Sequence, residues 1–276
     1  MRIITVDERP FHELPYHTVA PGGGGIMRAR LPILRALVDT LPAGIDALFA
    51  ASDLQGIADQ RSDGEASPRL MGEVLAEELA HMAALGFLPP PQRIAVLLCG
   101  DMYVRPELDT RGGMGDVRSV WRAFARPFRW VAGVPGNHDS FGTDPLERAA
   151  FAAERDIHML DGDLIKLDGL RIGGMGGVIG NRMMPGRHGI TFFTRGVQSL
   201  LRALPDVLLL HQGPDAPAAR LPGDPRVRAL LEEAKPTLVM CGHVHWHRPL
   251  ALLDNGTQVL NLEARGVLIQ KAPAET

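Results

Sequence analysis

Short apolar runs alternate with longer segments of helical spacing along most of the chain. The apolar runs occupy residues 46–50, 94–98, 130–134, 207–210 and 238–240. The segments of helical spacing occupy residues 69–85, 117–125, 144–154, 192–204 and 225–234. Strands that alternate with helices favour a layered α/β fold whose central strands are buried and largely parallel.

Two further stretches have the pattern of antiparallel strands. Residues 158–179 contain short apolar runs separated by Asp-Gly turns, which is typical of a meander. The tail repeats this pattern, with candidate strands at residues 249–253, 258–262 and 266–270. We expect these strands to form or extend a second sheet.

The N-terminal region is predicted to be an arm followed by a helix. The run from Pro21 to Gly25 is typical of a flexible joint because it holds four consecutive glycines. Residues 26–41 then have helical spacing, which requires Pro32 to lie in the first turn. The expected division is residues 1–44, an arm and helix packed on the main domain, and residues 45–276, the main domain.

Composition indicates an ordinary globular chain. Its 276 residues are 45% hydrophobic and 22% charged, which is enough for a large core. The N-terminus mixes charges and prolines with its apolar residues, unlike a secretory signal, and no run is long enough to cross a bilayer. With only Cys99 and Cys241 there is no disulfide framework, so a cytoplasmic location without membrane partners is expected.

Candidate metal ligands follow the ends of the buried apolar runs. They are Asp53, Asp101, Asn137 with His138, His211, and His243 with His245. In α/β sheets ligands bind beyond the carboxyl ends of the strands, so these side chains should face one crevice. A single Asp or His at such a place is usually structural, but the repetition at five strand ends favours a metal site.

Five blocks of the sequence resemble the ordered signatures of the calcineurin-like metallophosphoesterases. They are Ser52-Asp-Leu-Gln-Gly56, Gly100-Asp101, Gly136-Asn-His-Asp139, His211 and Gly242-His-Val-His245. The resemblance implies a four-layer sandwich of two mixed β-sheets flanked by helices. It also implies a pair of divalent metal ions at the strand ends.

The resemblance further implies a role for each matching position. The metal ligands would be Asp101 for both ions, Asp53 and His245 for the first, and Asn137, His211 and His243 for the second. His138 would act on the leaving-group oxygen as a general acid or transition-state stabiliser. Together these roles imply hydrolysis of a phosphate mono- or diester, with a hydroxide that bridges the two ions as nucleophile.

The first signature departs from the family pattern. It usually reads Asp-x-His, whereas position 55 here is glutamine. An amide oxygen is a weaker donor than imidazole toward zinc or iron. Gln55 therefore either binds the first metal weakly or makes only a hydrogen bond, and manganese, iron and zinc all remain candidate ions.

The second signature also departs from the pattern. Val104 stands where some members carry an aspartate that orients the catalytic histidine, which leaves Asp139 and Glu107 as candidates to orient His138. Arg105 matches the arginine that follows in those members. Its guanidinium either binds phosphate oxygens of the substrate or is simply exposed before the next proline.

These observations predict a metal-dependent phosphoesterase. A small phosphate-containing substrate is favoured over nucleic acid, because the net charge is −3 and only 5% of residues are aromatic. The alternative is a weakly active or inactive protein of the same fold that binds metal and a phosphate ligand, since Gln55 and Val104 both weaken the usual machinery. An interaction module that uses the N-terminal arm is a further alternative.

Overall fold

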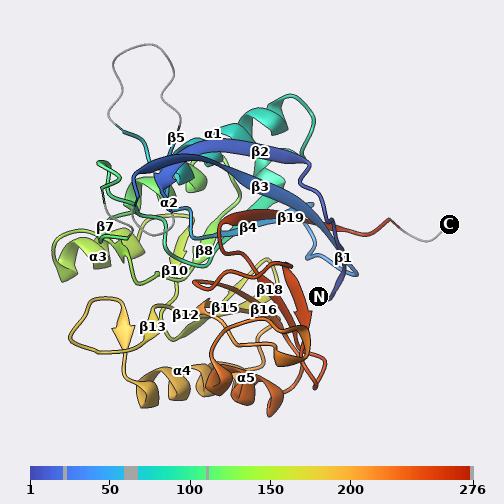
Figure 1. The fold of residues 1–276 in the computed structure, drawn as a ribbon. Coiled ribbons are helices and arrows are strands. Elements are labelled where there is room, and N and C mark those ends of the chain that lie inside the picture. The colour runs from blue at the N-terminus through green and yellow to red at the C-terminus, as the bar shows by residue number, and fades with distance from the viewer. Residues whose placement is uncertain (21–23, 59–67, 110–111, 274–276) are drawn as a thin grey trace.

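The computed structural model describes residues 1–20, 24–58, 68–109 and 112–273, and two β-sheets form its centre (Figure 1). The first sheet contains β1 (Ile3–Val6), β2 (His12–Val19), β3 (Ile26–Val38), β4 (Ala47–Ser52), β5 (Ile57–Ala58), β6 (Ile94–Leu98), β8 (Val131–Gly133), β10 (Ile157–Met159) and β19 (Arg265–Lys271). The second contains β11 (Asp163–Leu167), β12 (Leu170–Met175), β15 (Val207–Gln212), β16 (Leu238–Gly242), β17 (Leu250–Leu252) and β18 (Gln258–Asn261). The strand orders are β10-β8-β6-β4-β19-β3-β2-β5, with β1 on β3, and β11-β12-β15-β16-β18-β17.

Helices cover the outer faces of both sheets (Figure 1). They are α1 (Met71–Ala84), α2 (Arg118–Ala125) and α3 (Pro145–Ala152) on the side of the first sheet, and α4 (Ile190–Arg202) and α5 (Pro225–Glu232) on the side of the second. The remaining short elements are β7 (Gly115–Asp116) with β9 (Asp139–Ser140), β13 (Val178–Ile179) with β14 (Arg187–His188), η1 (Pro91–Arg93) and η2 (Pro217–Ala219). None of the helices in the described ranges is long and apolar enough to cross a membrane.

Three hydrophobic cores separate the four layers. Phe49 and Trp121 belong to the core between the first sheet and its helices, and Leu48 belongs to the core between the two sheets. Neighbouring residues of β4 enter different cores because successive side chains of a strand point to opposite faces. Phe193 of α4 and Leu210 of β15 belong to the third core, between the second sheet and its helices. The expected four-layer sandwich is therefore confirmed.

The predicted helices and buried strands are confirmed in type and place. The five segments of helical spacing correspond to α1 to α5, and the five apolar runs to β4, β6, β8, β15 and β16. The strands β4, β6 and β8 run parallel in the first sheet, whereas β15 and β16 run parallel in the second. Their carboxyl ends meet between the two sheets.

The prediction of a helix at residues 26–41 is wrong, because residues 26–38 form the long strand β3. β3 pairs antiparallel with β2 and parallel with β19, a strand more than 200 residues further along the chain. Helix-forming residues such as Leu31 and Ala36 are instead held by these pairings, because tertiary context overrides weak local propensity. Of the expected joint from Pro21 to Gly25, residues 21–23 lie outside the described residues.

The antiparallel stretches are confirmed only in part. β11 and β12 are antiparallel, as are β17 and β18. However, β10 is a parallel edge strand of the first sheet, and β19 enters that sheet between β4 and β3 and not the second. The local pattern identifies these segments as strands but contains no information on the sheet that each one joins.

Trp121 on α2 should be among the most costly side chains of the core to truncate. Its fully buried ring packs edge to face on Phe141 and Phe151, with centroids 5.6 and 6.1 Å away. We expect Trp121→Ala to lower the free energy of unfolding by about 3–5 kcal/mol, measured by urea titration of the metal-free protein. Trp121→Phe should cost less, since the buried indole N–H has no hydrogen-bond partner among the described residues.

The exposed Leu146 supplies the control for this prediction. Its side chain is on α3 and is 81% exposed, so Leu146→Ala should change the free energy of unfolding by less than about 0.5 kcal/mol. Equal losses for Trp121→Ala and Leu146→Ala would contradict the assignment of Trp121 to a closely packed core.

Candidate metal centre

Four loops that follow central strands, together with the end of β15, which contains His211, bring polar side chains together between the sheets. Asp53 follows β4, Asp101 follows β6, and His243 follows β16. All three have left-handed backbones, with φ of 55°, 57° and 70°. This conformation is uncommon for residues other than glycine, and it turns the chain sharply at the strand end.

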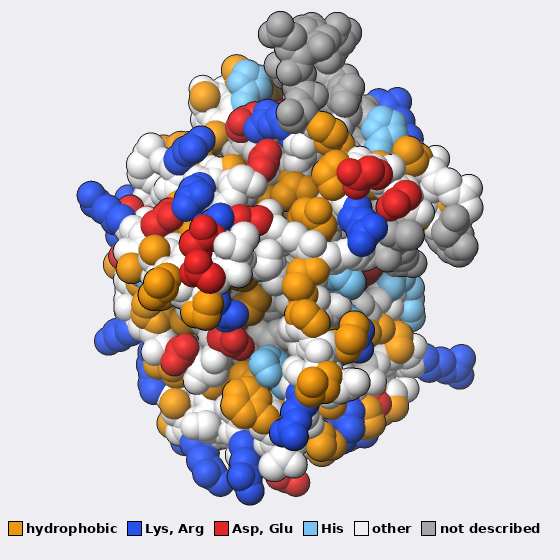
Figure 2. All heavy atoms as spheres, turned by 90° about the vertical axis from the view of Figure 1, so that its left-hand side faces the viewer, with side chains coloured by type: hydrophobic (Ala, Val, Ile, Leu, Met, Phe, Trp, Pro, Cys, Tyr) orange, Lys and Arg blue, Asp and Glu red, His pale blue; other side chains and the backbone are white. Residues whose placement is uncertain are grey.

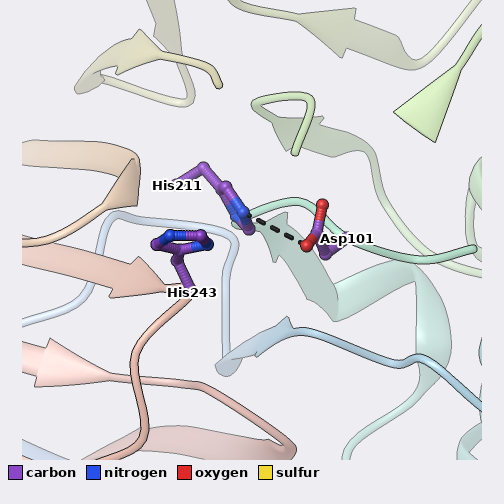
Figure 3. A group of neighbouring side chains, drawn as sticks. All are labelled: Asp101, His211 and His243. Atoms are coloured by element: carbon purple, nitrogen blue, oxygen red, sulfur yellow. Dashed lines mark ion pairs between the residues drawn. The ribbon is translucent and has the colours of Figure 1, made fainter. Parts of the chain in front are cut away.

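Asp101, His211 and His243 form a compact cluster (Figure 3). Each offers one ligand atom, and these atoms all lie within 4.8 Å of one another. Nε2 of His211 lies 3.4 Å from Oδ2 of Asp101, and the rings of His211 and His243 have centroids 5.1 Å apart. One carboxylate and two imidazoles are a donor set that suits a divalent transition metal.

The buried ring of His211 is held at both nitrogens. Its Nδ1 lies 2.7 Å from the carbonyl oxygen of Cys99, which can only accept, so Nδ1 donates. Its Nε2 lies 3.2 Å from Oδ1 of Asn137, beside Asp101. A hydrogen bond at one imidazole nitrogen that aims the other at a ligand is typical of metal-binding histidines.

Asp53 joins the first sheet to the loop that carries His243. Its Oδ2 accepts hydrogen bonds from Oγ of Ser52 at 2.6 Å and from the backbone N–H of His243 at 2.9 Å. A Cβ on Gly242 would lie 2.2 Å from the same oxygen. Only glycine at position 242 leaves room for this carboxylate, so the Gly-His-Val-His block contributes space as well as imidazoles.

Asp139 organises the loops on either side of it. Its carboxylate accepts three backbone hydrogen bonds of 2.8 Å, from Asp101, Met102 and Gly136. A Cβ on Gly136 would lie 2.0 Å from Oδ1 of Asp101, so these two loops are in direct contact. Asp139 therefore positions Asp101 and does not contact the ring of His138.

The ring of His138 is held by a backbone carbonyl. Its Nδ1 lies 2.6 Å from the carbonyl oxygen of Gly113 and donates to it, while its Nε2 lies 3.9 Å from Oδ2 of Asp101. The partner is thus neither Asp139 nor Glu107, the two candidates from the sequence. Sequence reasoning could not identify Gly113, because every residue has a carbonyl group.

Gln55 faces the site through its amide nitrogen. Nε2 of Gln55 donates to Oδ2 of Asp101 at 3.2 Å. The side chain also lines a cavity of about 180 Å³ together with Asp53 and Glu263. The amide nitrogen, and not the amide oxygen, faces Asp101, so binding of a metal by this side chain would require the amide to turn over.

His245 and Arg105 lie outside the three-residue cluster. The side chain of His245 is 69% exposed, and its Nδ1 lies 2.6 Å from Oε2 of Glu263. Arg105 is exposed, and its Cγ lies 2.7 Å from the position that a Cβ on Gly113 would occupy. The contact of Glu263 with His245 was not anticipated, since nothing in the sequence distinguishes this acid from others in the tail.

The buried charges of the site strongly affect one another. Burial raises the pKa of Asp101, but the charge of His211 and its hydrogen bond outweigh this and lower it to about 2. Burial likewise lowers the pKa of His211, but the charge of Asp101 outweighs it and raises the value to about 10. Asp101 and His211 therefore form a buried ion pair in the metal-free chain, in a place where a cation could replace the histidine proton.

The other two groups respond mainly to burial. Burial and the charge of Asp101 raise the pKa of Asp53 to about 7, although His211 opposes the shift. Desolvation by the surrounding protein and the charge of His211 lower the pKa of His243 to about 4, although the residue is exposed at the surface. His243 is therefore a neutral imidazole near pH 7, which is the protonation state that a metal ligand requires.

Several solved structures are similar to the chain, whereas no curated protein matches it. The protein TT1561 of Thermus thermophilus is 16% identical, with 79% of this chain and 89% of that chain covered and a TM-score of 0.52. A novel archaeal phosphodiesterase is 13% identical (79% and 83% covered, TM-score 0.36), and AQ665 of Aquifex aeolicus, a protein of unknown function, is 14% identical (80% and 95%, TM-score 0.33). At such identities the first likeness shows a shared fold.

A family model gives a more specific result. The model described as calcineurin-like phosphoesterase matches residues 52–247, which is more than half of the chain. The match begins at the end of β4 and ends beyond β16, so it includes the clustered Asp101, His211 and His243. The chain belongs to the calcineurin-like phosphoesterase family.

Proposed function

We propose that this chain is a metal-dependent hydrolase of phosphate mono- or diesters. The observation that carries the proposal is the convergence of Asp101, His211 and His243 at the strand ends, in a chain of the calcineurin-like phosphoesterase family. The donor set suits divalent transition metals, and the charges that surround it are buried and mutually dependent.

The proposed centre holds two divalent ions, which are manganese, iron or zinc. The proposed ligands are Asp101 for both ions, Asp53 and His245 for the first, and Asn137, His211 and His243 for the second. Gln55 would join the ligands of the first ion through its amide oxygen, after its amide turns over from the hydrogen bond with Asp101. Ions held there would supply Lewis-acid polarisation of the phosphoryl group and of water. Support for the second set comes from the contact of Asn137 with His211 and from the cluster itself.

His138 is proposed to protonate the leaving group. Because Nδ1 donates to the carbonyl of Gly113, the ring is oriented and the second proton of an imidazolium must reside on Nε2. Nε2 would give this proton to the ester oxygen as its bond to phosphorus breaks, so that the product leaves as a neutral alcohol. The carbonyl of Gly113 thus takes the orienting role that an acid has in other members.

Arg105 is proposed to bind phosphate oxygens of a small substrate. The stem of this exposed arginine, from Cγ to Nε, lies beside Gly113, whose carbonyl holds His138. Acidic and basic side chains are mixed over the face shown in Figure 2, and no single charge covers that face. This mixed surface supports a small phosphate compound as the substrate, because a long nucleic acid would bind along a continuous patch of basic side chains.

A second candidate is a protein that binds metal and phosphate with little or no turnover. The observation in its favour is that Gln55 turns its amide nitrogen toward Asp101, an orientation in which it offers the metal no lone pair. A screen of protein reconstituted with each ion separates the two candidates, with p-nitrophenyl phosphate, its bis ester, a cyclic diester and pyrophosphate as substrates. Ester hydrolysis that EDTA abolishes supports the hydrolase, whereas bound ions without hydrolysis support the binder.

Asp101→Asn should abolish both metal binding and turnover. The substitution removes the charge but keeps the shape, and asparagine tolerates the left-handed backbone of this position. Metal content after purification and the rate of ester hydrolysis are the measurements. Asp168→Asn is the matched control, because Asp168 also has positive φ but pairs with Arg129 away from the site, so its metal content should equal that of the wild type.

His138→Asn should lower the rate of hydrolysis by about 10²- to 10⁴-fold and leave the metals in place. The expected loss is the usual contribution of a positioned proton donor. The measurements are kcat and metal content of the same preparation. A loss of metal as large as that of an Asn137→Ala variant would make His138 a ligand and exclude the proposed role.

Gln55→His should tighten the first metal site and shift its preference from manganese toward zinc or iron. An imidazole is a stronger donor than a neutral amide for these borderline ions. Titration of the metal-free protein with each ion, wild type beside variant, measures the effect. Unchanged affinities for all three ions would mean that position 55 does not contact a metal.

A further inference from the structure

Glu263 lies in the short connection that leads from the second sheet to the first. β18 ends at Asn261 and β19 begins at Arg265, and Glu263 forms a bridge with Ser52, the residue before Asp53. The side chain of Glu263 is only 14% exposed. It lines the same cavity as Asp53 and Gln55, so it belongs to the surroundings of the first proposed metal.

The carboxylate of Glu263 contacts one nitrogen of His245. Oε2 of Glu263 lies 2.6 Å from Nδ1 of His245. A carboxylate oxygen only accepts, so Nδ1 carries a proton, and in the neutral form of the ring the lone pair lies on Nε2. This contact selects the tautomer that leaves Nε2 as the ring nitrogen able to bind a metal.

Hydrogen bonds from two buried side chains hold the backbone segments that carry Glu263 and His245. The side chain of Asn261, 1% exposed, donates to the carbonyl of Val244 at 2.9 Å and accepts from the backbone N–H of Glu263 at 3.2 Å. The buried Arg265 donates to the carbonyl of Trp246 at 2.6 Å and to that of Glu263 at 3.2 Å. Asn261 and Arg265 therefore link the backbone of the loop that carries His245 to the backbone of Glu263.

A simpler explanation of the contact between Glu263 and His245 is an ordinary surface ion pair, which contributes little to stability. His12 and Glu78 form another histidine–glutamate pair, at 3.1 Å, and both of its side chains are partly buried, with 29% and 31% exposed. Glu263 differs because it is mostly buried and lines the cavity with Asp53. Its partner His245 is open to solvent, with 69% of the side chain exposed.

We propose that Glu263 is a positioning residue that orients His245 toward the first metal ion. This inference rests on the proposed function, and it assigns to Glu263 a role that the family signatures do not include. A carboxylate on the far nitrogen fixes the ring and makes the imidazole a stronger donor. That support matters most in this chain, because Gln55 stands where a second imidazole would otherwise bind the same ion.

Titration of metal-free protein with Co²⁺ tests the inference without reference to activity. Glu263→Gln keeps the shape of the side chain but removes its charge, so we expect about 10- to 100-fold weaker binding at one of the two sites and unchanged binding at the other. The visible absorption of bound Co²⁺ should change at the weakened site as its imidazole is lost. Glu78→Gln is the matched control, and both of its sites should bind as in the wild type.

A second pair of variants separates positioning from direct ligation. In a His245→Ala background Glu263→Gln should cause no further loss of Co²⁺ affinity, because Glu263 would have no ring to orient. An equal further loss would mean that Glu263 binds the metal itself and would overturn the inference. Unchanged affinity in Glu263→Gln alone would overturn it as well.

The proposed function and the inference fail in different ways in this experiment. If the wild type binds no Co²⁺, the metal centre and the role of Glu263 are both excluded. If the wild type binds two ions and Glu263→Gln binds them equally well, only the inference is excluded. Thermal unfolding of the metal-free variants checks that each remains folded.

Discussion

The candidate centre depends on one buried carboxylate that binds no metal in our proposal. Asp139 accepts backbone hydrogen bonds from Asp101, Met102 and Gly136, and so it joins the loops that follow β6 and β8. Three such bonds offset part of the cost of burying an acid, although burial and the charge of Asp101 still raise the pKa of Asp139 to about 6. Together with the hydrogen bond from the backbone N–H of His138 to Oδ1 of Asp101, these bonds hold the left-handed turn at Asp101 against the loop of Gly136.

The site buries charged groups, and the burial of each charge would be unfavourable without the others. Asp101 and His211 are both buried, and each keeps its charge in the metal-free chain because of the other. Removal of one partner from such a pair leaves an uncompensated charge in a medium of low dielectric constant. A cation that binds both groups must displace the proton of His211, and it then compensates the charge of Asp101 in place of that proton.

Sequence patterns predicted the helices, the central strands and the residues at their ends, because these features depend on local periodicity and on the geometry of parallel strands. They failed for β3, whose residues suit a helix until β2 and β19 pair with them. They also could not identify the partners of the site histidines. Gly113 acts through a carbonyl that every residue has, and Glu263 becomes distinctive only when the crossing between sheets brings it to His245.

The position of β19 has a consequence for the order of assembly. This strand fills the gap between β3 and β4, to which it is joined along nearly its whole length, although it lies more than 200 residues away in the chain. During synthesis the edges of β3 and β4 that pair with β19 therefore remain unpaired until residues 265–271 leave the ribosome. Pairings of such separation close slowly, and open strand edges invite association with other chains. Newly made protein should thus be most vulnerable to aggregation just before β19 is available, which makes β19 the final strand to join the first sheet.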